Sequence, residues 1–158
     1  MNAASLPGRY KGHITRLRKF LRADGKEQSC LLEAAFWLGL FRFALSIVPF
    51  KFMARGLGMQ KVETDGVPLS AATSRDAMAV ARAVQTMACN LPWHSRCLVQ
   101  AAAAKRMLDR RCIPSTLYLG VARDEKQNLI AHAWLRCGDV IITGKAEKDC
   151  FTTVSMFT

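Results

Sequence analysis

The sequence predicts an α+β protein, in which helical segments come first and an antiparallel sheet follows. Apolar residues recur at helical spacing as far as about residue 111, whereas after Pro114 they form short runs of strand length. Polar turns short enough for hairpins separate those runs. Since 158 residues support one domain with an extension, we expect a helical lead-in over residues 1–60 and a core over residues 61–158.

The lead-in is expected to hold two helices. A short amphipathic helix is predicted over residues 13–21, and Asp24 with the glycine after it ends that helix. A longer helix is predicted over residues 30–50, closed by Pro49, with the sequence CLLEAAFWLGLFRFALSIVPF. That segment is long enough to cross a bilayer, which takes about 20 residues.

Two charges argue against a membrane span in this longer helix. Glu33 and Arg42 interrupt it, and a central charge costs about 2.5–3.5 kcal/mol on insertion scales. They lie on opposite helix faces, since nine residues at about 100° each turn the helix by about half a circle, so they do not pair. We therefore favour a helix buried against the rest of the protein with both charges at its margins. A helix apposed to a membrane surface is the alternative.

Two further helices are predicted in the core. Ser74 is a good N-cap for a helix that runs to about Cys89. A second helix starts near Ser95 or Arg96 and runs to about Arg111. Its alanines allow close packing, and its basic last turn suits the negative end of the helix dipole.

The sheet is expected to begin as a meander of three strands. Strand-like apolar runs cover residues 116–122, 129–135 and 140–143. The tail over residues 150–157 either adds a fourth strand or lies across the sheet.

Composition limits the partners and the compartment. Twenty-three basic and 12 acidic residues give a net charge of +11, which favours polyanions, an anionic membrane surface or an acidic partner. The basic residues are spread along the chain without a recognisable nucleic-acid module, so we expect no nucleic acid. The first 29 residues lack the apolar stretch of a signal peptide, which predicts a cytoplasmic protein with free thiols.

Metal and cofactor chemistry is not indicated. The six cysteines include no C-x-x-C pair, and the three histidines have no carboxylate cluster beside them. The sequence therefore predicts neither a zinc site nor a disulfide framework, and we expect no cofactor.

Cys97 is the candidate nucleophile. If Ser95 is the N-cap, Cys97 is the second helical residue, where unpaired backbone N–H groups favour a thiolate and can hold an oxyanion. The alternative is a small buried thiol in the core. His132, in the second predicted strand, is the candidate base, and His94 is its rival in the loop before Cys97.

These residues resemble the transglutaminase-like, papain-type cysteine hydrolases. More specifically, RCLVQAAAAKRMLDRRCIPSTLYLGVARDE followed by AHAWL resembles the leader peptidases of lasso-peptide biosynthesis, and the helical lead-in is similar to theirs. The resemblance covers roughly residues 14–157. It implies a transglutaminase-like core in which the catalytic helix packs on an antiparallel sheet. It also implies Cys97 as nucleophile and His132 as general base and acid.

The resemblance implies partners as well. Such a peptidase removes the leader from a ribosomally made precursor peptide, and a separate ATP-dependent cyclase then closes the ring. The chain begins at the helical lead-in, so we expect the split form of the family, which relies on a separate leader-recognition protein. Peripheral contact with a membrane is a further expectation from residues 30–50.

The sequence departs from the family pattern at three places. The triad acid after His132 is missing, since Thr143 and Gly144 are expected opposite it. Thr143, a backbone carbonyl or Asp149 then orients the base, or only a dyad remains. Asp139 is expected to lie in the turn, too far away.

The other two departures are single replacements. Cys112 replaces a glycine after the catalytic helix, which implies a different or strained helix end. Arg136 replaces an acid, which adds positive charge near the site and suggests an acidic substrate. Trp93 and Trp134 are either cleft residues or core aromatics.

Two rival functions remain open at this point. One is a non-catalytic scaffold that binds the peptide only. The other is a basic membrane-surface protein anchored by residues 30–50.

Overall fold

Three helices and one four-stranded sheet make up the described part of the molecule. The computed structural model describes residues 24–48, 63–64, 66–93, 95–145 and 150–158. The helices are α2 (Gly25–Ile47), α4 (Ala71–Asn90) and α5 (Cys97–Asp109), and the strands are β1 (Thr116–Arg123), β2 (Leu129–Cys137), β3 (Val140–Thr143) and β4 (Thr152–Phe157). The predicted α+β order is confirmed. The helix expected over residues 13–21 and the boundary expected at residue 60 lie outside the described residues.

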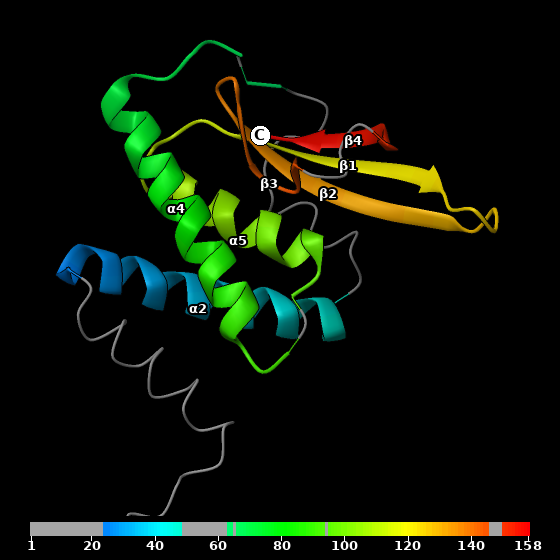
Figure 1. Ribbon diagram of the computed structural model, residues 1–158, viewed down its shortest axis with the longest axis horizontal. Helices are drawn as coiled ribbons and strands as arrows, with labels where there is room; N and C mark the ends of the chain where they lie inside the picture. The colour runs from blue at the N-terminus through cyan, green and yellow to red at the C-terminus, as the bar shows by residue number, and fades with distance from the viewer. Residues whose placement is uncertain (1–23, 49–62, 65, 94, 146–149) are drawn as a thin grey trace, which may run out of the picture.

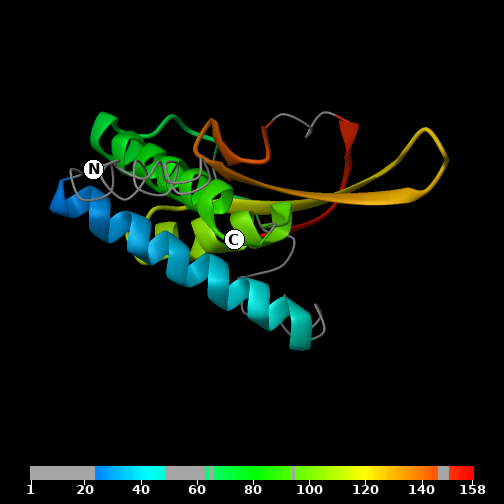
Figure 2. The ribbon, with the colours of Figure 1, turned by 60° about the horizontal axis from the view of Figure 1, so that its bottom comes forward.

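The sheet is entirely antiparallel, with strand order β3-β2-β1-β4. The meander predicted for the first three strands is confirmed, and the tail forms the fourth strand, on the free edge of β1. Helix α5 lies between the sheet and α2, while α4 crosses beside it (Figures 1 and 2). The β1–β2 hairpin extends beyond the helices (Figure 1).

Alanines determine how closely α5 packs. Ala101, Ala102, Ala103 and Ala104 are all fully buried, so neighbours approach this helix on most of its circumference. Its buried surface continues into Leu117 and Leu135 on the inner face of the sheet, which are fully buried too. The core of the protein therefore surrounds α5.

The N-terminal ends of α2 and α4 differ from expectation. Helix α2 begins five residues before Cys30, because the Asp24 carboxylate accepts a hydrogen bond from the Gly25 N–H and caps the helix. Ser70, rather than Ser74, caps α4 by accepting from the Thr73 N–H at 3.2 Å. The N–H of Ser74 instead donates to the Ser70 carbonyl, within the first turn.

The C-terminal end of α5 contains strained backbone. Cys112 has a φ of +54°, the left-handed region that favours glycine. Its N–H donates to the carbonyl of Asp109, and the Ile113 N–H donates to that of Leu108, which is the Schellman pattern. The strained helix end predicted from the cysteine is therefore present.

Helix α2 is less buried than expected. Only Ala34 and Leu38 are buried, on the face toward α4 and α5. Glu33 pairs with Arg110 and Arg111 at its margin. The opposite face carries a stripe of five large apolar side chains, each at least 42% exposed: Leu32, Phe36, Leu40, Phe43 and Ile47. The expectation of a helix buried among other elements is thus wrong for this face, because α4 and α5 cover one side of α2 only.

We predict that Cys112→Gly stabilises the protein. Glycine adopts the left-handed conformation without strain, so the free energy of unfolding should rise by about 0.5–1 kcal/mol in urea denaturation. Cys112→Ala keeps the strain and should change little. The matched control is Cys89→Gly in the last turn of α4, which should lower the same quantity by about 0.5–1 kcal/mol. A destabilised Cys112→Gly protein would contradict the prediction.

Candidate active site

An open cleft of about 700 Å³ lies where α5 begins and β3 ends. Two residues predicted from the sequence, Cys97 and His132, both line it. The other lining residues come from α4, the first turn of α5, and the ends of β2 and β3: Gln85, Arg96, Gln100, Ala131, Ile142, Thr143, Gly144 and Lys145. The cleft therefore gathers segments that are up to 60 residues apart in the chain.

Cys97 is the first residue of α5, not the second as expected. Arg96 has extended backbone angles and occupies the N-cap position without a side-chain cap. The expected cap, Ser95, lies one residue further out, where its carbonyl accepts a hydrogen bond from the Gln100 side chain at 2.8 Å. Cys97 is half-buried, and its backbone N–H belongs to the first turn, where N–H groups have no partner within the helix.

His132 is held in place by a backbone carbonyl. Its Nε2 lies 3.1 Å from the oxygen of Gly144, and the side chain is 8% exposed. A carbonyl only accepts hydrogen bonds, so Nε2 is the donor in this contact. The ring also packs against Phe151 and Trp134, with centroid distances of 5.1 and 6.1 Å.

Strand pairing explains why this histidine is accessible from the cleft. Thr143, the last residue of β3, pairs with Leu135. The three residues of β2 from His132 to Trp134 therefore lie beyond the end of β3. They pair with β1 on one side, but no described strand pairs with them on the other. The side chains of His132 and Trp134 share one face of the sheet, whereas Ala133 and Leu135 face the core.

Gly144 cannot carry a side chain. Its φ is +74°, and a Cβ there would lie 2.6 Å from the Ala133 carbonyl oxygen and 2.9 Å from Nε2 of His132. The close approach of this residue is what brings its own carbonyl to the imidazole. Glycine at this position is thus a requirement of the histidine contact.

The register corrects the expected partner of His132. The turn between Cys137 and Val140 already places Thr143 away from His132, and a bulge between Leu135 and Arg136 moves it one residue further, so that it pairs with Leu135. Asp139 is exposed in the turn and does not line the cleft. The Gly144 carbonyl, which contacts the imidazole, corresponds to one of the alternatives given above, a backbone carbonyl. His94 and Asp149 lie outside the described residues.

Comparison of the sequence with models of protein families identifies the superfamily of this chain. The model of the transglutaminase-like superfamily matches residues 44–156, well over half of the chain. The chain belongs to the transglutaminase-like superfamily. This superfamily includes cysteine peptidases, in agreement with a cleft lined by a helix-initiating cysteine and a strand histidine. No curated protein and no solved structure gives a significant match.

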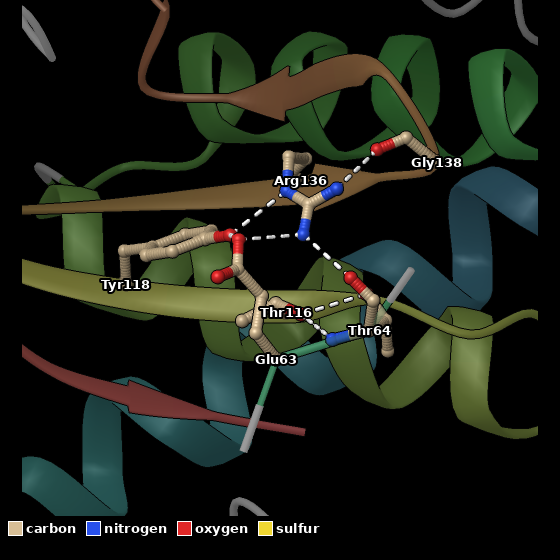
Figure 3. Close-up of polar contacts among 6 residues, drawn as sticks. All are labelled: Glu63, Thr64, Thr116, Tyr118, Arg136 and Gly138. Atoms are coloured by element: carbon tan, nitrogen blue, oxygen red, sulfur yellow. Dashed lines mark hydrogen bonds and ion pairs between the residues drawn. The ribbon is translucent and has the colours of Figure 1, made fainter. Parts of the chain in front are cut away.

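Arg136 does not add its charge to the cleft of this transglutaminase-like chain. Its guanidinium donates to Glu63, Tyr118 and the backbone carbonyls of Thr64 and Gly138, at 2.6–2.8 Å (Figure 3). The carboxylate of Glu63 pairs with this charge. Burial raises the pKa of Tyr118, and its hydrogen bond to Glu63 raises that pKa further. The interpretation of Arg136 as a sign of an acidic substrate is therefore wrong.

The two tryptophans do not line the cleft. Trp134 is buried on the face of the sheet opposite Ala133 and Leu135, where it stacks on Tyr118 with a centroid distance of 5.5 Å and covers Gly120, at which a Cβ would lie 2.7 Å from its ring. Trp93 lies near Gly39 of α2, and its Nε1 is buried without a partner among the described residues.

Several cleft residues were not identified from the sequence. Arg96 and Gln100 were detectable in principle, because they lie one residue before and three after Cys97, on the same first turn. Gln85 and Lys145 had no such signal, since only the tertiary fold brings α4 and the end of β3 to the cleft. No group of three or more metal-ligating side chains occurs in the part of the chain described here.

Thiol reactivity should separate the cysteines by pH. Burial raises the pKa of Cys30 and of Cys137, whose thiol also donates to the Pro114 carbonyl. Because a raised pKa delays thiolate formation, these two should reach half-maximal alkylation rate at a higher pH than the exposed cysteines, which are Cys89, Cys112 and Cys150. Peptide mapping of iodoacetamide-treated protein between about pH 7 and 10 measures this.

The same shifts make stability fall with pH. A thiol with a raised folded-state pKa stabilises the fold fully below its ordinary pKa, and this contribution is lost as the pH rises through the folded value. For the alkylation experiment, denatured protein is the control, because all six thiols should then show the same dependence of alkylation rate on pH. If buried and exposed thiols of the folded protein reached half-maximal alkylation rate at the same pH, the prediction that burial raises the pKa of Cys30 and Cys137 would be contradicted.

Proposed function

We propose that this chain is a cysteine peptidase that removes the leader from a lasso-peptide precursor. The observation that carries the proposal is that Cys97, at the start of α5, and His132, with Nε2 bonded to the Gly144 carbonyl, line one cleft in a transglutaminase-like chain. The resemblance of the cysteine and HAW segments to lasso leader peptidases supports the choice of substrate.

The proposed reaction follows from the two side chains. The imidazole of His132 takes the thiol proton of Cys97, and the sulfur attacks the scissile carbonyl carbon. The N–H of Cys97 donates to the oxyanion that forms. The C–N bond then breaks, and His132 gives its proton to the leaving amine. Water, activated by the same imidazole, hydrolyses the thioester and restores the thiol.

The partners of this peptidase follow from the same proposal. A separate leader-recognition protein would present the precursor, and an ATP-dependent cyclase would use the amine that cleavage releases. The reaction would take place in the cytoplasm, where the six thiols remain reduced.

Substituting the nucleophile tests the peptidase activity. Cys97→Ala should abolish cleavage of a co-encoded precursor, because none of the other described cleft residues carries a thiol that can form the thioester, while precursor binding remains. His132→Ala should lower the rate about 10²–10⁴-fold. Cys89→Ala, which removes an exposed thiol on α4, is the matched control and should cleave normally. Mass spectrometry of the precursor, with the neighbouring proteins present, follows the reaction.

Two results would decide against the peptidase. Unchanged cleavage with Cys97→Ala would exclude it, and a wild-type chain that binds the precursor without cleaving it would favour the scaffold function.

We also propose that the apolar stripe of α2 lies on an anionic membrane surface. Helix α2 is long and apolar enough to cross a bilayer, a property shared by core helices of soluble proteins. Its stripe is solvent-exposed, however, and lies directly opposite the face that packs on α4 and α5. A net charge of +11 favours an anionic surface over a neutral one. Peripheral contact buries the stripe without requiring Arg42 to enter the bilayer.

Vesicle sedimentation tests the membrane contact. The protein should sediment with vesicles of phosphatidylglycerol and phosphatidylcholine but much less with phosphatidylcholine alone. Replacing Leu32, Phe36 and Phe43 together by glutamine should weaken binding at least about tenfold, since each loses buried apolar area. Val154→Gln, at an exposed apolar residue of β4, is the control. Binding that survives the triple substitution, or a dimer that the same substitution dissociates, would contradict the proposal.

A further inference from the structure

Among the described residues that line the cleft around Cys97, the charged ones are all basic. Arg96 and Lys145 line it from two different elements, and both are exposed. None of its described lining residues is a carboxylate, and the described part of the chain offers neither cation an ion-pair partner. Arg110 and Arg111, which follow the other end of α5, are by contrast paired with Glu33.

A buried hydroxyl without a partner lies in the same cleft. Thr143 is 9% exposed, and its Oγ1 has no hydrogen-bond partner in the part of the chain described here. Such a group is costly to leave unpaired, so a rotation of the Thr143 side chain toward a bound carboxylate would gain a hydrogen bond. The first turn of α5, which also lines the cleft, adds N–H donors and the positive end of the helix dipole.

We infer that Arg96, Lys145 and Thr143 form a carboxylate subsite beside the nucleophile. It selects peptides with an aspartate or glutamate next to the cleaved bond, and this substrate class rests on the proposed function. A guanidinium, an ammonium and a hydroxyl are all donors, and carboxylates are the anions that an unmodified peptide offers. Arg136 has no part in this subsite, because its guanidinium is hydrogen-bonded and ion-paired to Glu63.

Alkylation of Cys97 tests the subsite without any need for cleavage. Iodoacetate carries a carboxylate and iodoacetamide does not, while both replace iodide with the same sulfur. The alkylation rate with iodoacetate divided by that with iodoacetamide should be at least about fivefold higher at Cys97 than at three exposed thiols. Those internal controls are Cys89, Cys112 and Cys150. Peptide mapping by mass spectrometry measures all four sites in one sample.

Variants then assign the effect. Replacing Arg96 and Lys145 together by glutamine should bring the ratio at Cys97 down to that of the exposed thiols. Lys126→Gln, which removes one charge at the tip of the β1–β2 hairpin, should leave it unchanged. If the double variant does not fold, about 0.5 M salt added to the native protein should lower the ratio instead. A ratio at Cys97 equal to the controls, or insensitive to both treatments, would overturn the subsite.

Peptide cleavage gives the second test. Four variants of the co-encoded precursor are made. Two carry Asp or Asn at the residue before the cleaved bond, and two carry Asp or Asn at the residue after it. In at least one position the Asp version should have about a fivefold higher kcat/KM, and the double variant should remove this preference. Equal cleavage at both positions would overturn the subsite and leave the peptidase intact. A raised alkylation ratio with an uncleaved precursor would support the subsite and count against the peptidase.

Discussion

The close packing of α5 against the sheet is the constraint on which the cleft depends. Four consecutive buried alanines allow this approach, since larger side chains would hold the helix away. The buried Lys105 links α5 to the sheet, because its ammonium donates to the carbonyl of Ser115, just before β1, and it also pairs with Asp109 of the same helix. Cys97 therefore begins its helix at the level where β3 ends and His132 is open to the cleft.

Much of this arrangement could be predicted from local patterns. The change from helical to alternating periodicity gave the order of elements, and the segments that became β1, β2 and β3 were identified within two residues at each end. Cys97 and His132 were singled out because a helix start and a strand between small residues are local features. Their presence in one cleft follows from the packing of α5 on β2, which no local pattern encodes.

Two features of the assembled sheet were missed from the sequence. The turn between Cys137 and Val140 and the bulge after Leu135 together pair Thr143 with Leu135, so it does not lie opposite His132. The charge of Arg136 was assigned to the cleft because it is close to His132 in the chain. Residues of one strand at even spacing do share a face, but Glu63 and Tyr118 hold this side chain in a separate network (Figure 3).

Two residues in left-handed backbone show where the fold tolerates strain. At Cys112 the cost is conformational only, because the side chain is exposed beyond the end of α5, so a cysteine survives there. At Gly144 a Cβ would meet both the Ala133 carbonyl and the imidazole of His132, so strain would be added to a steric clash. The helix end can therefore vary without loss of the cleft. The residue after β3 cannot, because the orientation of His132 depends on its carbonyl.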